Sequence, residues 1–154
     1  MGIFKSNAGY GSSDGQSQLG PAIIVHNLDQ TEIAMKTISV TSIRTVLLSA
    51  ENAAEISGSA VFYSMINQAF LRNPHANFVA ILDCGGNYGA ALEAIRTGAD
   101  YISFAGAGEV TAKIKNIAAQ LNVSVIKRPT DYLDLNTVTN HQKAVETYLA
   151  NKPG

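Results

Sequence analysis

The segment with the most chemical potential is residues 83–89, Asp-Cys-Gly-Gly-Asn-Tyr-Gly, which directly follow a short apolar run. Its closely spaced glycines allow backbone N–H groups to approach an anion, and the dipole of a following helix adds attraction. Residues 105–108, Ala-Gly-Ala-Gly, repeat this arrangement after the next run. Neither segment has the full glycine spacing of a dinucleotide-binding or P-loop motif. The pattern therefore predicts an anion site, with two tight strand-to-helix turns as the alternative.

Three side chains are candidates for catalysis, namely His26, Asp83 and Cys84. Cys84 stands near an expected helix N-terminus, which lowers the pKa of a thiol and favours the nucleophilic thiolate. His26 is the candidate base for this thiol if their two strands are neighbours, and a structural imidazole otherwise. The alternative for Cys84 is a small apolar side chain of the core.

No metal site or cofactor is expected. The one histidine that follows an apolar run, His26, has no second histidine at a suitable spacing, because His75 and His141 stand in other parts of the chain. Carboxylates at the ends of the other runs are scattered and lack the spacing of a ligand set.

Five short runs rich in Val and Ile predict strands, and longer amphipathic segments alternate with them. The expected helix around residues 61–70 repeats apolar side chains at three-to-four spacing and stops at Asn73-Pro74. Another ends at Gly98, and a last helix is expected over about residues 137–150. The predicted strands are residues 22–26, 45–48, 78–82, 102–104 and 123–126.

This alternation requires parallel strands joined by right-handed crossovers. We therefore expect a single α/β domain over residues 21–150, with three layers and a five-stranded, doubly wound parallel sheet of the flavodoxin-like type. A half-barrel that pairs with a second copy has the same local pattern and is the alternative. Residues 1–20 hold five glycines and almost no apolar periodicity, which predicts a flexible tail.

Parallel sheets bind ligands at the carboxyl ends of their strands, where loops and helix N-termini converge. Two cations, Lys127 and Arg128, follow the fifth predicted strand and could neutralise a bound anion. The residues expected to bind a ligand at this edge are Asn27, Ser49, Gly85, Gly86, Asn87, Gly106, Gly108, Lys127 and Arg128.

The composition excludes several classes of protein. The 154 residues carry 11 Lys+Arg against 12 Asp+Glu, a formal net charge of -1, which disfavours nonspecific binding to nucleic acid. A single cysteine excludes an intramolecular disulfide framework and favours a reducing, cytoplasmic location. No apolar run is long enough for a transmembrane helix.

Residues 24–30, Ile-Val-His-Asn-Leu-Asp-Gln, and 81–85, Ile-Leu-Asp-Cys-Gly, resemble a group of short, uncharacterised bacterial α/β proteins. This resemblance implies the fold and the domain boundaries, and it implies no chemistry. Residues 98–102, Gly-Ala-Asp-Tyr-Ile, and the exit after them are similar to phosphate-binding strand pairs of barrel lyases and isomerases.

A weaker resemblance is to the receiver domains of two-component signalling, through an aspartate after the third strand and a lysine after the fifth. Asp83 and Lys127 stand at these places, whereas His26-Asn27 replaces the acidic pair that holds a divalent cation in receivers. The resemblance therefore implies a degenerate receiver that does not accept phosphate.

Together these observations predict a cytoplasmic domain that binds a small anionic or phosphorylated metabolite at the carboxyl edge of a parallel sheet. Enzymatic turnover is left open. The alternative is a noncatalytic interaction module, receiver-like or a scaffold, that works through a partner protein or through self-association.

Overall fold

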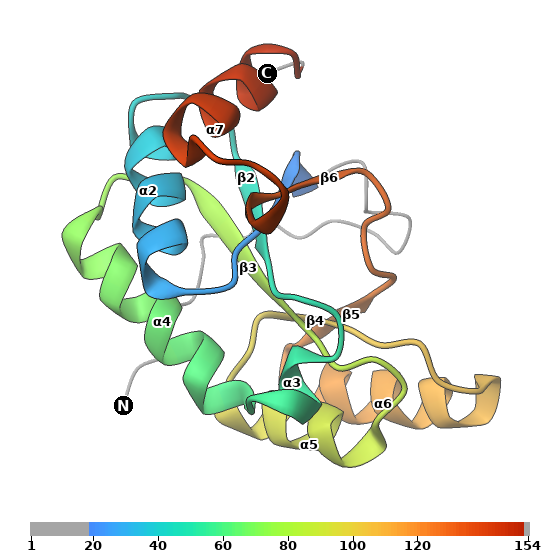
Figure 1. Cartoon of the computed structure of the whole chain (residues 1–154). Coiled ribbons are helices and arrows are strands. Elements are labelled where there is room, and N and C mark those ends of the chain that lie inside the picture. The colour runs from blue at the N-terminus through green and yellow to red at the C-terminus, as the bar shows by residue number, and fades with distance from the viewer. Residues whose placement is uncertain (1–18, 153–154) are drawn as a thin grey trace.

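The computed structural model describes residues 19–152, which form one α/β unit around a parallel sheet. The sheet has six strands in the order β5-β4-β3-β2-β1-β6 (Figure 1). The α/β class and the parallel pairing are confirmed, but the predicted number of five strands is wrong. Residues 1–18 of the expected tail lie outside the described residues. The strands are β1 (Ala22–Ile24), β2 (Thr45–Leu48), β3 (Phe78–Asp83), β4 (Tyr101–Ser103), β5 (Ser124–Ile126) and β6 (Tyr132–Asp134).

Side-chain caps and one glycine set the limits of several helices. Asn27, Asn87 and Asn140 each accept a hydrogen bond from a backbone N–H in the first turn of the following helix. Gly98, with a φ of 94°, ends α5 in the left-handed conformation. The helices are α2 (Leu28–Ser39), α3 (Ala53–Ile56), α4 (Ser59–Arg72), α5 (Tyr88–Thr97), α6 (Gly108–Gln120) and α7 (His141–Ala150).

The last predicted helix begins four residues later than expected. Residues Leu135–Thr137 instead form a 3-10 helix, η1, because the side chain of Asp134 accepts a hydrogen bond from the backbone N–H of Asn136. Helix α7 then starts after its own cap. Among the described residues, no helix is long and apolar enough to cross a membrane.

All crossovers from β1 to β5 advance in the same direction along the sheet. Right-handed crossovers that advance one way place their helices on one face of the sheet. In agreement, a single apolar core joins buried side chains of α2 to α7 to strand residues such as Ile23, Leu47 and Ile102. Flavodoxin-like sheets have the order 2-1-3-4-5, which differs from the order found here. The buried side chains of helices α2 to α7 thus belong to the apolar cluster on this face of the sheet.

The other face of the sheet carries a second apolar cluster, which includes Leu19, Ile24, Leu48 and Ile81. We call this side the second face. From β5 the chain returns across the sheet to β6, and Figure 1 shows this connection on the side away from α2 and α4. A right-handed crossover in the reverse direction has to run over the second face. Residues 127–131 therefore carry the cation Arg128 onto this face.

Candidate functional site

Asp83, the last residue of β3, is the centre of a buried polar network at the carboxyl edge. Its Oδ2 accepts a hydrogen bond from the Asn52 backbone N–H at 2.7 Å, and its Oδ1 accepts one from Ser103 Oγ. The Asp83 backbone N–H donates to Ser49 Oγ at 2.9 Å. The residue is 5% exposed. Because both carboxylate oxygens have partners, Asp83 holds the loops together and is not presented to a ligand.

The side chain of Arg128, which follows β5, extends to the end of β3. Its Nη1 lies 3.9 Å from Asp83 Oδ1, and its Nε lies 4.0 Å from Glu51 Oε1. These ion pairs are too long to be hydrogen bonds. Nη1 is buried and has no hydrogen-bond partner among the described residues. Since buried N–H groups in folded proteins nearly always have an acceptor, Nη1 is a candidate donor to an oxygen of a ligand.

The N-terminus of α6 offers further donors at the same edge. Its N-cap residue is Ala107, so no side chain caps the helix. The first N–H groups of an uncapped helix have no acceptor within the helix and carry its positive dipole end. At Gly108 a Cβ would meet nothing within 4 Å, which shows that the surface there is open. Of the two glycine-rich exits, the one after β4 is therefore better suited to an anion.

The glycine-rich segment after β3 is a tight turn, which was the alternative to an anion site. Gly85 has a φ of 54°, and a Cβ built on it would lie 1.9 Å from Asn52 Oδ1. A Cβ on Gly86 would approach the Ala105 carbonyl oxygen to 3.2 Å. Both glycines are explained by the close approach of neighbouring loops, and Asn87 is occupied as the cap of α5.

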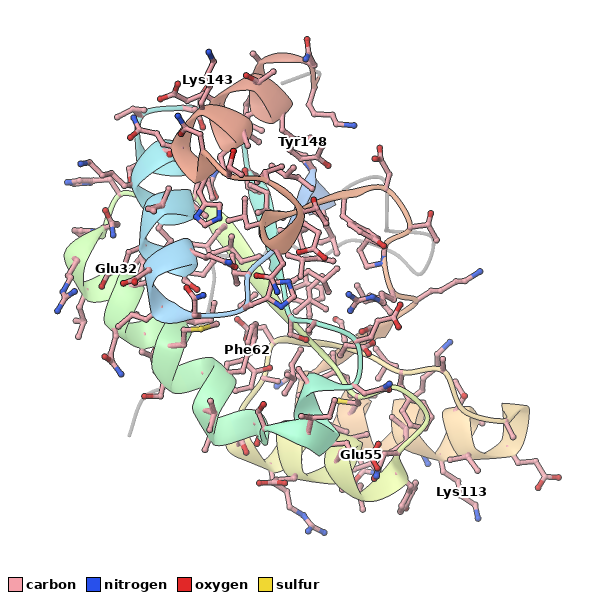
Figure 2. The ribbon with its side chains drawn as sticks, in the orientation of Figure 1. Glu32, Glu55, Phe62, Lys113, Lys143 and Tyr148 are labelled. Atoms are coloured by element: carbon pink, nitrogen blue, oxygen red, sulfur yellow. The ribbon has the colours of Figure 1, made fainter. Side chains whose placement is uncertain are left out.

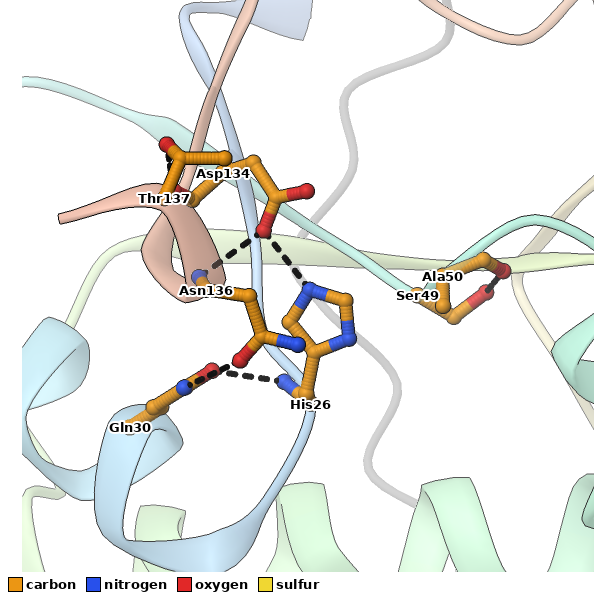
Figure 3. Close-up of polar contacts among 7 residues, drawn as sticks. All are labelled: His26, Gln30, Ser49, Ala50, Asp134, Asn136 and Thr137. Atoms are coloured by element: carbon orange, nitrogen blue, oxygen red, sulfur yellow. Dashed lines mark hydrogen bonds and ion pairs between the residues drawn. The ribbon is translucent and has the colours of Figure 1, made fainter.

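His26 and Asp134 form a polar pair that the sequence did not predict (Figure 3). His26 Nε2 lies 2.7 Å from Asp134 Oδ1. Gln30 supports the pair because its Oε1 accepts a hydrogen bond from the His26 backbone N–H and its Nε2 donates to Asn136 Oδ1. The His26 side chain is 22% exposed. Within the described part of the chain, its second ring nitrogen, Nδ1, makes no hydrogen bond.

Cys84 lies on the opposite side of the sheet from this pair. It belongs to the helix-covered core and is fully buried. Burial, and to a smaller extent the charge of Asp83, raises the pKa of the Cys84 thiol to about 12. The thiol is therefore protonated near neutral pH, and the structure matches the alternative of a core side chain.

This environment predicts slow alkylation of Cys84. A pKa three units above the usual 9.0 leaves roughly a thousandfold less thiolate at pH 7, and burial slows the reaction further. Iodoacetamide labelling followed by mass spectrometry measures the rate, with the urea-denatured chain as control. Equal labelling rates in the native and denatured states would contradict this assignment and restore Cys84 as a candidate nucleophile.

The other residues that the sequence predicted to bind a ligand either have structural partners or are exposed to solvent. Asn27 is occupied as the cap of α2, and Ser49 Oγ donates to the Ala50 carbonyl oxygen at 2.9 Å. A Cβ on Gly106 would clash with the Phe104 ring at 2.6 Å, which explains this glycine by packing. Lys127 is exposed beside Arg128.

Two other lysines, Lys113 on α6 and Lys143 on α7, lie at opposite ends of the molecule (Figure 2). They therefore do not share a patch that would hold a polyanion. Among the described residues, no group of three or more His, Cys, Asp or Glu side chains is placed to hold a metal ion.

No protein-family model matches the sequence, and no curated protein matches it either.

Proposed function

We propose that this chain binds a small anionic or phosphorylated metabolite at the carboxyl edge of the sheet, in the cytoplasm. The observation that carries the proposal is the buried Nη1 of Arg128, which lacks a hydrogen-bond partner among the described residues. The uncapped N-terminus of α6 supports it, because α6 follows β4 and β4 is the neighbour of β5 in the sheet. A phosphate or carboxylate oxygen would satisfy both kinds of donor.

The surrounding charges favour an anion of limited size. Asp83 already receives hydrogen bonds from Asn52 and Ser103, so its charge is partly balanced without Arg128. Glu51 is 76% exposed, and water screens its charge. The guanidinium is thus available to one anionic group, while Asp83, Glu51 and Glu109, which lies in the first turn of α6, oppose a ligand of high negative charge.

Replacing Arg128 by glutamine is predicted to weaken binding at least about tenfold, which is the usual effect of losing a hydrogen bond to a charged group. Calorimetry with a panel of phosphate monoesters and small carboxylates measures the change. Lys113→Gln on α6 is the matched control and should leave the affinity unaltered. If no anion binds to the wild-type chain, or if Arg128→Gln binds as well as the wild type does, the proposal fails.

A noncatalytic interaction module is the second candidate, because two large apolar side chains are exposed on consecutive helices. Ile56 at the end of α3 is 76% exposed, and Val61 in the first turns of α4 is also exposed. A receiver-like module of the phosphate-accepting kind would need an accessible aspartate, whereas Asp83 is buried. Light scattering after gel filtration would support this candidate if it showed a stable assembly that Ile56→Ser disrupts and that small anions leave unchanged.

A further inference from the structure

The pair of His26 and Asp134 lies on the same face of the sheet as Arg128. Ile24 and Ile81 both belong to the apolar cluster of the second face. Side chains alternate along a strand, so the residues two positions further, His26 and Asp83, point to that face as well. Arg128 reaches Asp83 from the connection that crosses it. The imidazole and the guanidinium therefore border the same part of the carboxyl edge.

The spacing of the strands sets the separation of these two groups. β2 lies between β1, which precedes His26, and β3, which ends at Asp83. Neighbouring strands are about 4.8 Å apart, so the backbones at His26 and Asp83 lie about 10 Å from each other. Arg128 Nη1 lies 3.9 Å from Asp83 Oδ1. The imidazole and the guanidinium are thus separated on the scale of a small metabolite.

The hydrogen bond to Asp134 determines which tautomer of the imidazole is favoured, and therefore which hydrogen bond Nδ1 can make. A carboxylate accepts hydrogen bonds, so it favours the tautomer with the proton on Nε2 and leaves a lone pair on Nδ1. Figure 3 shows Nδ1 turned away from Asp134, with Ser49 and Ala50 on that side of the view. In this neutral tautomer, Nδ1 makes no hydrogen bond with the described residues and can accept one from a hydroxyl group.

We propose that His26 and Asp134 form the second half of the anion site, where Nδ1 accepts a hydrogen bond from a hydroxyl of the bound ligand. The ligand class is then a small hydroxylated phosphate or carboxylate, with its anionic group at Arg128 and a hydroxyl group at His26. This inference rests on the anion site proposed above. It adds the imidazole of His26 as the group that distinguishes a small anion with a hydroxyl group from one without.

Two matched compounds test the assignment, because glycerol 3-phosphate carries hydroxyl groups that propyl phosphate lacks. Calorimetry on the wild-type chain should show about fivefold tighter binding of glycerol 3-phosphate, the usual effect of one neutral hydrogen bond. His26→Leu should remove this preference and keep the affinity for propyl phosphate. His75→Leu, at an exposed turn before β3, is the control and should retain the preference.

The outcomes separate the two proposals. If both compounds bind wild type equally and both lose affinity in Arg128→Gln, the role of His26 is overturned and the anion site stands. If neither compound binds to the wild type, both proposals fall. Should His26→Leu not fold, nitrogen NMR of the wild-type imidazole replaces it. The Nδ1 resonance should shift with glycerol 3-phosphate and stay in place with propyl phosphate, and an unshifted resonance with both would overturn the assignment.

Discussion

Replacing Asp83 with alanine is expected to lower the free energy of unfolding by about 3 kcal/mol or more, the largest effect of a single polar substitution in this fold. The substitution would leave the Asn52 N–H and the Ser103 hydroxyl without their acceptor, and the Arg128 guanidinium without its buried counter-charge. Losing the acceptor of several buried groups at once costs more than losing one exposed contact. Urea unfolding followed by circular dichroism measures the change.

Two variants serve as references for this result. Asp83→Asn keeps the shape and one acceptor oxygen, so it should retain more stability than Asp83→Ala. Asp131→Ala removes an exposed carboxylate that pairs with Lys152, and it should change the free energy of unfolding by no more than about 0.5 kcal/mol. An Asp83→Ala chain within about 1 kcal/mol of the wild type would show that the network is not needed for the fold.

Gly85→Ala is predicted to destabilise the chain by about 2 kcal/mol or more. The residue has a φ of 54°, which L-residues other than Asn and Asp rarely adopt, and the added Cβ would lie 1.9 Å from Asn52 Oδ1. Asn52 is itself left-handed, with a φ of 58°, so this loop has little room to adjust. The free energy of unfolding in urea is again the measurement.

Gly108→Ala is the matched control for Gly85→Ala. Gly108 is the first residue of α6, and a Cβ there meets nothing within 4 Å. Alanine reduces the entropy of the unfolded chain, so this variant should be as stable as the wild type or slightly more stable. Equal stabilities for Gly85→Ala and Gly108→Ala would mean that the turn after β3 is not constrained as the structure describes it.

The first five strands could be predicted from the sequence because each is a short apolar run between helices. β6 could not, because Tyr132–Asp134 is a three-residue edge strand, half-exposed and without an apolar run. It forms because residues 132–134 pair in parallel with Ala22–Ile24. Such pairing depends on the position of β1, which lies more than a hundred residues earlier in the chain.

The strand order could not be predicted from the sequence either, because it also depends on long-range contacts. A doubly wound sheet and a sheet with consecutive strands share the same strand and helix patterns, and they differ in the direction of each crossover. That direction depends on how all the helices pack. The contacts of α2 with α4 and α7, and of α5 with α4 and α6, are long-range features without a sequence signature.

Part of the candidate site followed from the sequence. The parallel topology correctly brought Asp83 and Arg128 to one edge, although six of the predicted binding residues proved to be caps, turns or loop supports. The proposed pairing of His26 with Cys84 failed because the two side chains lie on opposite faces of the sheet. Asp134 was missed because it lies 108 residues from His26 and on the strand that was not predicted.

A crystal structure of the chain with glycerol 3-phosphate is the sharpest test of anion binding at Arg128. A phosphate oxygen is expected within hydrogen-bond distance of Arg128 Nη1, near the first N–H groups of α6. Density for the phosphate at another place on the molecule, with Nη1 satisfied by water alone, would contradict it.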